Sequence, residues 1–175
     1  MVNPAARLLT FARAAALALA LACVASPLCA QVTKGSAFPS LADAGLVGSL
    51  PQSEGKVTLV DFWASWCAPC KASFPVYSAL QRDFAAKGLV IIAVSVDEDP
   101  ASYASFIENH KPLFPTVHDA AHRLVAQVQV PTMPTSYLLD KAGKVRFVHP
   151  GFHGDSTDKE LRAEIAALLD GKASP

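Results

Sequence analysis

Residues 60–71 read Val-Asp-Phe-Trp-Ala-Ser-Trp-Cys-Ala-Pro-Cys-Lys, and they join a predicted buried strand to a predicted helix. The run Val57 to Phe62 is apolar and rich in β-branched residues, as in a strand covered on both faces. A helical pattern begins at about Cys67 and continues to Lys87, with Gly88 as its stop signal. Free N–H groups and the positive end of a helix dipole stabilise a thiolate at a helix start. A second cysteine one turn deeper, Cys70, suits dithiol–disulfide exchange.

A Cys-x-x-Cys pair has two other uses in proteins. It can be half of a zinc site, but structural zinc usually takes four ligands, and the five histidines form no second pair at zinc-finger spacing. It can also form a short structural disulfide. Redox chemistry is the favoured reading, and these two remain as alternatives.

The composition of the whole chain limits the classes of function. Its 175 residues correspond to about one domain, and 51% hydrophobic residues supply a sizeable core, which excludes a largely disordered chain. Fifteen basic side chains balance fifteen acidic ones, so no positive field exists to hold a phosphate backbone. We therefore expect no nucleic-acid partner.

The first thirty residues differ from the rest of the chain. A run of twelve apolar residues from Ala14 to Ala25 follows Arg7 and Arg13. A membrane-spanning helix needs about 20 apolar residues, so the shorter run is typical of a signal-peptide core. We expect residues 1–30 to be a signal peptide that is cleaved before Gln31.

Removal of the leader changes the charge and the cysteine count. It leaves 13 of the 15 basic side chains against 15 acidic ones, a net charge of −2. It also removes Cys23 and Cys29, so residues 31–175 retain only the pair Cys67 and Cys70, which indicates redox chemistry rather than a disulfide framework. The alternatives are an uncleaved leader that serves as an anchor, or a lipidated Cys23.

The remaining patterns predict an α/β sandwich built on one mixed sheet. We expect strands and helices in this order: strand Leu89–Val96, helix Asp99–Asn109, strand Phe114–His118, helix Ala120–Val128, hairpin strands Ser136–Asp140 and Lys144–Val148, and a last helix that ends at Gly171. Thr157 to Glu160 reads as a capping box for that last helix. No linker is long enough to split the domain.

Two segments carry a resemblance to a known family. Residues 60–71 resemble the active-site segment of the thioredoxin superfamily, with Pro75 at the place of its helix-kinking proline, and residues 130–140 resemble its cis-proline segment. The leader and the added elements at about residues 99–128 are similar to the TlpA/ResA/CcmG-type thiol–disulfide oxidoreductases of bacteria. The resemblance implies a thioredoxin-like three-layer sandwich, with a central mixed β-sheet flanked by helices and a helix–strand–helix insertion.

The resemblance also assigns roles to individual residues. It implies that Cys67 attacks, that Cys70 resolves the mixed disulfide, that Asp61 moves the Cys70 proton, and that Pro134 is cis and packs against the disulfide. It implies substrate contacts at Trp66, Ala68, Pro69, Met133 and Thr135. Core packing is the alternative for Met133, and a structural hydrogen bond is the alternative for Asp61. The pattern calls for no metal and no cofactor besides the redox-active Cys67–Cys70 disulfide.

One position departs from the pattern of that branch. Several of its reductases carry a glutamate three residues after the second cysteine, where this chain has Ser73. Proton handling therefore differs, and Asp61 is the candidate to replace the missing acid.

These features favour a periplasmic reductase of client disulfides that acts as a monomer. The branch suggests apocytochrome c or copper-assembly proteins as clients, and a membrane electron donor must supply the reducing equivalents. One alternative is a disulfide-forming oxidant, although Ala68 and Pro69 offer a thiolate no polar partner. A redoxin-type peroxidase is disfavoured because no Pro-x-x-x-Thr/Ser segment precedes Cys67. A non-catalytic copper carrier or assembly factor would need a third ligand.

Overall fold

The computed structural model describes residues 31–172, so the predicted leader and its alternatives lie outside the described residues. The elements in chain order are β1 (Val57–Trp63), α2 (Ala68–Phe84), the 3-10 turn η1 (Ala85–Lys87), β2 (Leu89–Ser95), α3 (Pro100–His110), β3 (Thr116–His118), α4 (Arg123–Val128), β4 (Thr135–Leu139), β5 (Val145–Pro150) and α5 (Asp155–Leu169). Each predicted strand and helix is present, and most boundaries shift by only a few residues.

The five strands form one mixed sheet in the order β3-β2-β1-β4-β5. β1 pairs in parallel with β2, and β2 with β3, whereas β4 runs antiparallel to both β1 and β5. β1 is therefore the central strand, and all seven of its residues are buried. This burial explains its continuous apolar sequence.

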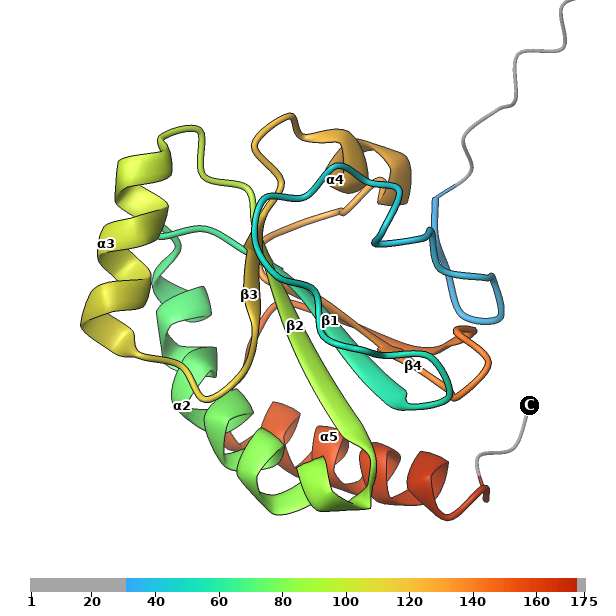
Figure 1. Ribbon diagram of the computed structural model, residues 1–175. Coiled ribbons are helices and arrows are strands. Elements are labelled where there is room, and N and C mark those ends of the chain that lie inside the picture. The colour runs from blue at the N-terminus through green and yellow to red at the C-terminus, as the bar shows by residue number, and fades with distance from the viewer. Residues whose placement is uncertain (1–30, 173–175) are drawn as a thin grey trace, which may run out of the picture.

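Helices and loops cover both faces of the sheet and make three layers (Figure 1). Successive side chains of a strand point to opposite faces, so Leu59 and Trp63 belong to the core under α2, α3 and α5. Val60 and Phe62 belong to the other core, under α4 and the segment before β1. The structure confirms the predicted three-layer sandwich and its helix–strand–helix insertion of α3, β3 and α4.

Aromatic packing anchors the insertion beneath the strand–helix junction. The Trp63 ring lies 4.7 Å from the Phe74 ring of α2 and 4.6 Å from the Phe106 ring of α3, centroid to centroid. Phe74 and Phe106 also meet edge to face at 5.0 Å. Such pairs add stability beyond the area they bury. Trp63 is therefore a packing residue of this core.

Two local predictions about helix ends need correction. The helix predicted to continue to Lys87 ends at Phe84, and a single 3-10 turn completes it. The capping box predicted from Thr157 is wrong, because α5 begins at Asp155 with Gly154 as its N-cap. Thr157 lies inside the helix, where its hydroxyl accepts a hydrogen bond from the His153 N–H at 3.0 Å.

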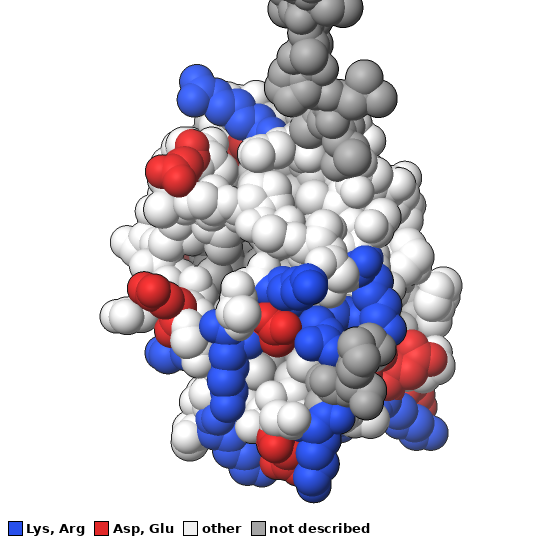
Figure 2. Space-filling view, turned by 90° about the vertical axis from the view of Figure 1, so that its right-hand side faces the viewer, with Lys and Arg blue, Asp and Glu red and all other residues white. Residues whose placement is uncertain are grey.

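Charged side chains of both signs share the face that Figure 2 shows. Lys and Arg gather over its lower half, and Asp and Glu lie between them (Figure 2). Ion pairs join opposite charges, as between Arg146 and Asp140 at 3.3 Å and between Arg162 and Asp158 at 2.9 Å. Within residues 31–172, no helix has the length and apolar character needed to cross a membrane.

Candidate active site

The two cysteines form a disulfide where β1 gives way to α2. The Cα atoms of Cys67 and Cys70 are 5.3 Å apart. Cys67 keeps 5% of its surface exposed and Cys70 keeps none, which matches the predicted difference in depth. The next residue toward β1, Trp66, is 69% exposed and stands at the surface beside the pair.

Cys67 is the N-cap of α2, and its sulfur takes the place of a capping oxygen. The Cys70 N–H donates to the Cys67 Sγ at 3.3 Å, which satisfies one of the free donors at the helix start. Pro69 lies in the first turn, where its missing N–H removes no helical hydrogen bond. The same N–H groups would stabilise a thiolate on Cys67 after reduction of the disulfide.

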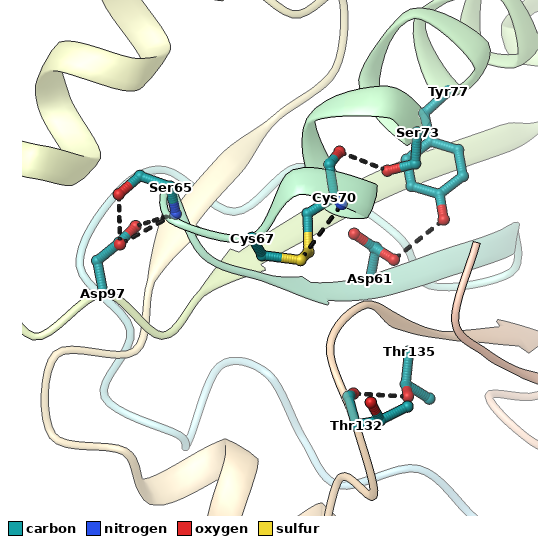
Figure 3. Close-up of a disulfide and its surroundings, with 9 residues drawn as sticks. All are labelled: Asp61, Ser65, Cys67, Cys70, Ser73, Tyr77, Asp97, Thr132 and Thr135. Atoms are coloured by element: carbon teal, nitrogen blue, oxygen red, sulfur yellow. Dashed lines mark hydrogen bonds between the residues drawn. A yellow bond between two sulfur atoms is a disulfide. The ribbon is translucent and has the colours of Figure 1, made fainter.

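Asp61 lies in the second half of β1 and points toward α2, beside the disulfide (Figure 3). Its carboxyl is completely buried, and the Tyr77 hydroxyl donates to its Oδ1 at 3.1 Å. Its Oδ2 has no hydrogen-bond partner among the described residues. Burial raises the pKa of Asp61 well above 3.8, and the Tyr77 hydrogen bond only partly opposes this. The Tyr77 hydrogen bond fits the structural alternative for Asp61, and its role in moving the Cys70 proton stays a prediction.

The raised pKa of Asp61 makes the stability of the fold depend on pH. The folded chain keeps the carboxyl proton over a pH range where the unfolded chain has lost it, so the free energy of unfolding falls as pH rises above about 4. Asp61→Asn removes this loss, and we expect the variant to gain stability relative to the wild type from pH 4.5 to pH 7.5. Urea titrations at both pH values measure the difference.

An exposed acid provides a control of opposite sign. The Ser102 hydroxyl and the backbone N–H groups of Ala101 and Ser102 lower the pKa of Asp99, so its contribution is present at neutral pH and is lost on acidification. Asp99→Asn should therefore lose stability relative to the wild type as pH rises from about 2.5 to about 4.5, and the difference should stay nearly constant from there to pH 7.5. A pH-independent difference between wild type and Asp61→Asn would contradict the burial effect.

Ser73 occupies the position of the glutamate found in related reductases. It is fully buried, and its hydroxyl donates to the Cys70 carbonyl at 2.8 Å (Figure 3). A hydroxyl with an ordinary pKa far above neutrality does not replace a carboxylate as a proton acceptor. In the described part of the site, Asp61 is the buried carboxyl on the disulfide side of the sheet.

A second carboxylate, Asp97, holds the loop that leads to Cys67. The Ser65 N–H donates to both of its oxygens, at 3.0 and 3.1 Å, and the Ser65 hydroxyl donates at 2.7 Å (Figure 3). The Ser95 hydroxyl donates to Oδ2 at 2.7 Å. Asp97 follows β2, and its side chain is buried at the edge where β1 and β2 both end. It ties the neighbouring parallel strand to the active-site loop.

Asp97→Ala should destabilise the fold by about 2–4 kcal/mol, because it leaves partly buried donors on Ser65 and the buried hydroxyl of Ser95 without acceptors. Thermal or urea unfolding of the oxidised protein measures this loss. Asp99→Ala is the neighbouring control and should cost less, since Asp99 is exposed. Equal losses of unfolding free energy in the two variants would contradict the claim that Asp97 stabilises the loop before Cys67.

The segment before β4 lies at the same end of the sheet as the disulfide. β4 is antiparallel to β1, and Thr135 at the start of β4 pairs with Phe62 near the end of β1. The residues just before β4 therefore lie beside the residues just after β1. The Met133–Pro134 peptide bond is cis, as predicted. Pro134 is buried, and Met133 is half-buried against the core that contains both cysteines.

The other predicted contact residues differ in exposure. Ala68 and Pro69 are exposed beside the disulfide. Thr135 is completely buried, and its hydroxyl donates to the Thr132 carbonyl at 2.8 Å (Figure 3). The structure thus brings all nine predicted site residues to one end of the sheet, but it places the Thr135 side chain inside.

The sequence did not identify Tyr77, Ser65 and Asp97 as site residues. Tyr77 lies at helical spacing among apolar residues of α2, where the pattern does not distinguish a tyrosine from a phenylalanine. Asp97 directly follows a buried strand parallel to β1, and this position was a usable signal. Acids that end neighbouring parallel strands meet at one edge of a sheet.

Most histidines of the described chain are engaged away from the cysteines. His118 Nε2 lies 2.7 Å from the Asp97 carbonyl, and His122 Nε2 lies 3.2 Å from the Val96 carbonyl. His149 Nε2 lies 2.7 Å from Glu164. Among residues 31–172, no three His, Cys, Asp or Glu side chains gather in a way that could hold a metal ion.

The sheet order, the disulfide at the start of α2 and the cis-proline before β4 define a protein of the thioredoxin-like fold class. The chain belongs to the AhpC/TSA family, whose model matches residues 37–148. This agrees with the resemblance seen in the sequence.

Individual relatives agree with this class. Thiol-disulfide oxidoreductase ResA of Bacillus cereus is 33% identical over 96 residues, which are 55% of this chain and 56% of ResA. The chain thus spans little more than half of that relative. Thioredoxin-like protein YneN of Bacillus subtilis is 32% identical over 124 residues, 69% of this chain and 70% of YneN. A crystal structure assigned as thiol:disulfide interchange protein DsbE from Chlorobium tepidum superposes with a TM-score of 0.74 and 33% identity, over 79% of this chain and 99% of that one.

Proposed function

We propose that this protein is a thiol–disulfide oxidoreductase that reduces disulfides of client proteins. The observation that carries the proposal is the Cys67–Cys70 disulfide at the amino end of α2, with Cys67 the more exposed sulfur. A structural disulfide needs no exposed sulfur and no helix start. A nucleophile needs both access and a stabilised thiolate.

The reaction begins from the reduced pair. The Cys67 thiolate attacks one sulfur of the client disulfide, forms a mixed disulfide and releases the other client sulfur as a thiolate. Cys70 then loses its proton to Asp61 and attacks the Cys67 sulfur, which releases the second client thiolate and forms the Cys67–Cys70 disulfide. Two electrons pass from the protein dithiol to the client, and the client thiolates take up protons.

The surface around the pair supports binding of an extended client segment. We assign Trp66, Ala68 and Pro69 to contact with the client, because all three are exposed beside Cys67. Met133 presents its backbone at the end of β4, where a client strand can add to the chain by backbone pairing. We assign Thr135 to holding the Thr132 carbonyl rather than to direct contact, because its side chain is buried.

We further propose that the protein works in the periplasm, after export by the predicted leader. An oxidising compartment cannot supply reducing equivalents, so a membrane donor would have to reduce the Cys67–Cys70 disulfide after each turnover. Apocytochrome c and copper-assembly proteins are the proposed clients. The protein would act as a monomer, with no bound cofactor.

A comparison of two oxidants tests the proposed reaction. The reduced protein is mixed in a stopped-flow instrument either with a protein disulfide or with hydrogen peroxide, and formation of the Cys67–Cys70 disulfide is followed. We expect the protein disulfide to react much faster at equal concentration. A faster reaction with peroxide would favour the redoxin-type peroxidase instead.

A further inference from the structure

Two buried tyrosines lie on opposite faces of the sheet, and only one of them has a hydrogen-bond partner for its hydroxyl among the described residues. The Tyr77 hydroxyl donates to Asp61 Oδ1 at 3.1 Å, on the face of the sheet that carries the disulfide. The Tyr137 hydroxyl belongs to the other core and has no hydrogen-bond partner among the described residues. Tyr77 reaches Asp61 from the same helix that carries Cys70, seven residues further along (Figure 3).

The surroundings of Asp61 make this single hydrogen bond important. In the sheet, Asp61 lies between Ala93 of β2 and Ser136 of β4. Ala93 has no polar side chain, and the Ser136 hydroxyl makes no hydrogen bond to the carboxyl. Asp61 shares its core with buried residues of α3 and α5, which contribute apolar side chains there: Phe106, Leu161, Ile165 and Leu168. Tyr77 is the titratable group that contacts the carboxyl, and Cys67 and Cys70 become titratable after reduction. Tyr103 and His110 of α3 lie further out, where they pack on Trp63 and Phe106 of the same core.

No cation acts on the Asp61 carboxyl among the described residues. Desolvation by burial raises its pKa, and the Tyr77 hydroxyl is the one group that lowers it. Desolvation and the negative charge of Asp61 also raise the pKa of Tyr77, so the tyrosine stays protonated and remains a donor at neutral pH. Asp61 Oδ2 is left without a partner.

We propose that Tyr77 is a positioning residue that directs Asp61 toward Cys70: its hydroxyl occupies Oδ1 and leaves Oδ2 to exchange the Cys70 proton. The inference rests on the proposed oxidoreductase function. In the resolving step, the Cys70 S–H bond breaks and its proton passes to Asp61 Oδ2. The Cys70 sulfur then bonds to the Cys67 sulfur, and the bond between Cys67 and the client breaks.

Tyr77→Phe keeps the ring and removes the donor, so Asp61 ionises only at higher pH. Reduced protein is mixed with excess glutathione disulfide, and acid-quenched mass spectrometry follows the decay of the transient mixed disulfide of Cys67 with glutathione from pH 4 to pH 9. We expect the midpoint of the Tyr77→Phe profile to rise by about one pH unit, with about a tenfold slower decay below it. Tyr137→Phe is the matched control and should overlay the wild type.

The Asp61→Asn background separates this role from a general effect on the fold. Because Tyr77 acts through the carboxylate, Tyr77→Phe should cause no further shift when Asp61 is already Asn. A Tyr77→Phe profile equal to that of the wild type would overturn the inference, and so would an equal shift in the Asn background.

A second readout keeps the inference independent of turnover. In the oxidised protein, carbon-13 NMR of the Asp61 carboxyl should show ionisation at higher pH in Tyr77→Phe and no change in Tyr137→Phe. A wild type whose reduced Cys67–Cys70 pair is oxidised neither by glutathione disulfide nor by a protein disulfide would refute the proposed function, while this titration would still decide whether Tyr77 controls Asp61.

Discussion

Cys67→Ser is expected to reduce disulfide exchange to the uncatalysed background rate. Within residues 31–172, Cys67 is the only cysteine that keeps any exposed surface, at 5%, since Cys70 is completely buried. A serine hydroxyl at the same helix start does not ionise near neutral pH, so the site loses its nucleophile. Single-turnover reduction of a protein disulfide measures the effect.

The stability of this variant needs its own reference. Cys67→Ser also removes the Cys67–Cys70 disulfide and a sulfur that caps α2. Chemically reduced wild type is the matched reference, because it lacks the disulfide but keeps the thiol. We expect the two proteins to unfold at similar urea concentrations. Substantial remaining exchange in a folded Cys67→Ser protein would place the nucleophile elsewhere.

Cys70→Ser is expected to trap clients as stable mixed disulfides with Cys67. The nucleophile stays in place, but the buried sulfur that would attack the Cys67–client bond is gone. Adducts should approach one per protein when a disulfide-containing client is present in excess. Non-reducing electrophoresis and mass spectrometry detect them, and dithiothreitol should release the client.

The double variant Cys67→Ser, Cys70→Ser is the control for trapping. It should capture nothing, because it has neither the attacking nor the resolving sulfur. Equal adduct levels in Cys70→Ser and in the double variant would show that capture occurs outside the Cys67–Cys70 pair. Absence of any adduct in Cys70→Ser would contradict the two-step mechanism.

The strands, the helices and the redox pair could be predicted because their signals are local. β1 is a continuous apolar run since it lies at the centre of the sheet, and Cys67 precedes a helical pattern that the structure reproduces. The predicted start of α5 was wrong for a physical reason. Gly154 adopts φ 64° at the N-cap, so the helix begins at Asp155. The local pattern had instead favoured a start at Thr157, the first residue of the predicted capping box.

The polar contacts of the site depend on long-range packing and could not be predicted in the same way. Asp97 binds Ser65 across 32 residues of sequence, and Tyr77 meets Asp61 because α2 packs on β1. Neither pairing leaves a periodic signal. Asp61 was found only through the family resemblance, and the geometry added its partner and its unpaired oxygen.

The reduction potential of the Cys67–Cys70 pair tests the central claim most directly. The protein is equilibrated with defined mixtures of reduced and oxidised glutathione, and the oxidised fraction is measured by mass after thiol alkylation. A disulfide reductase should give a potential near or below about −230 mV, in the range of thioredoxins and glutaredoxins. A potential near about −120 mV would contradict reduction of clients and would identify the pair as a disulfide-forming oxidant.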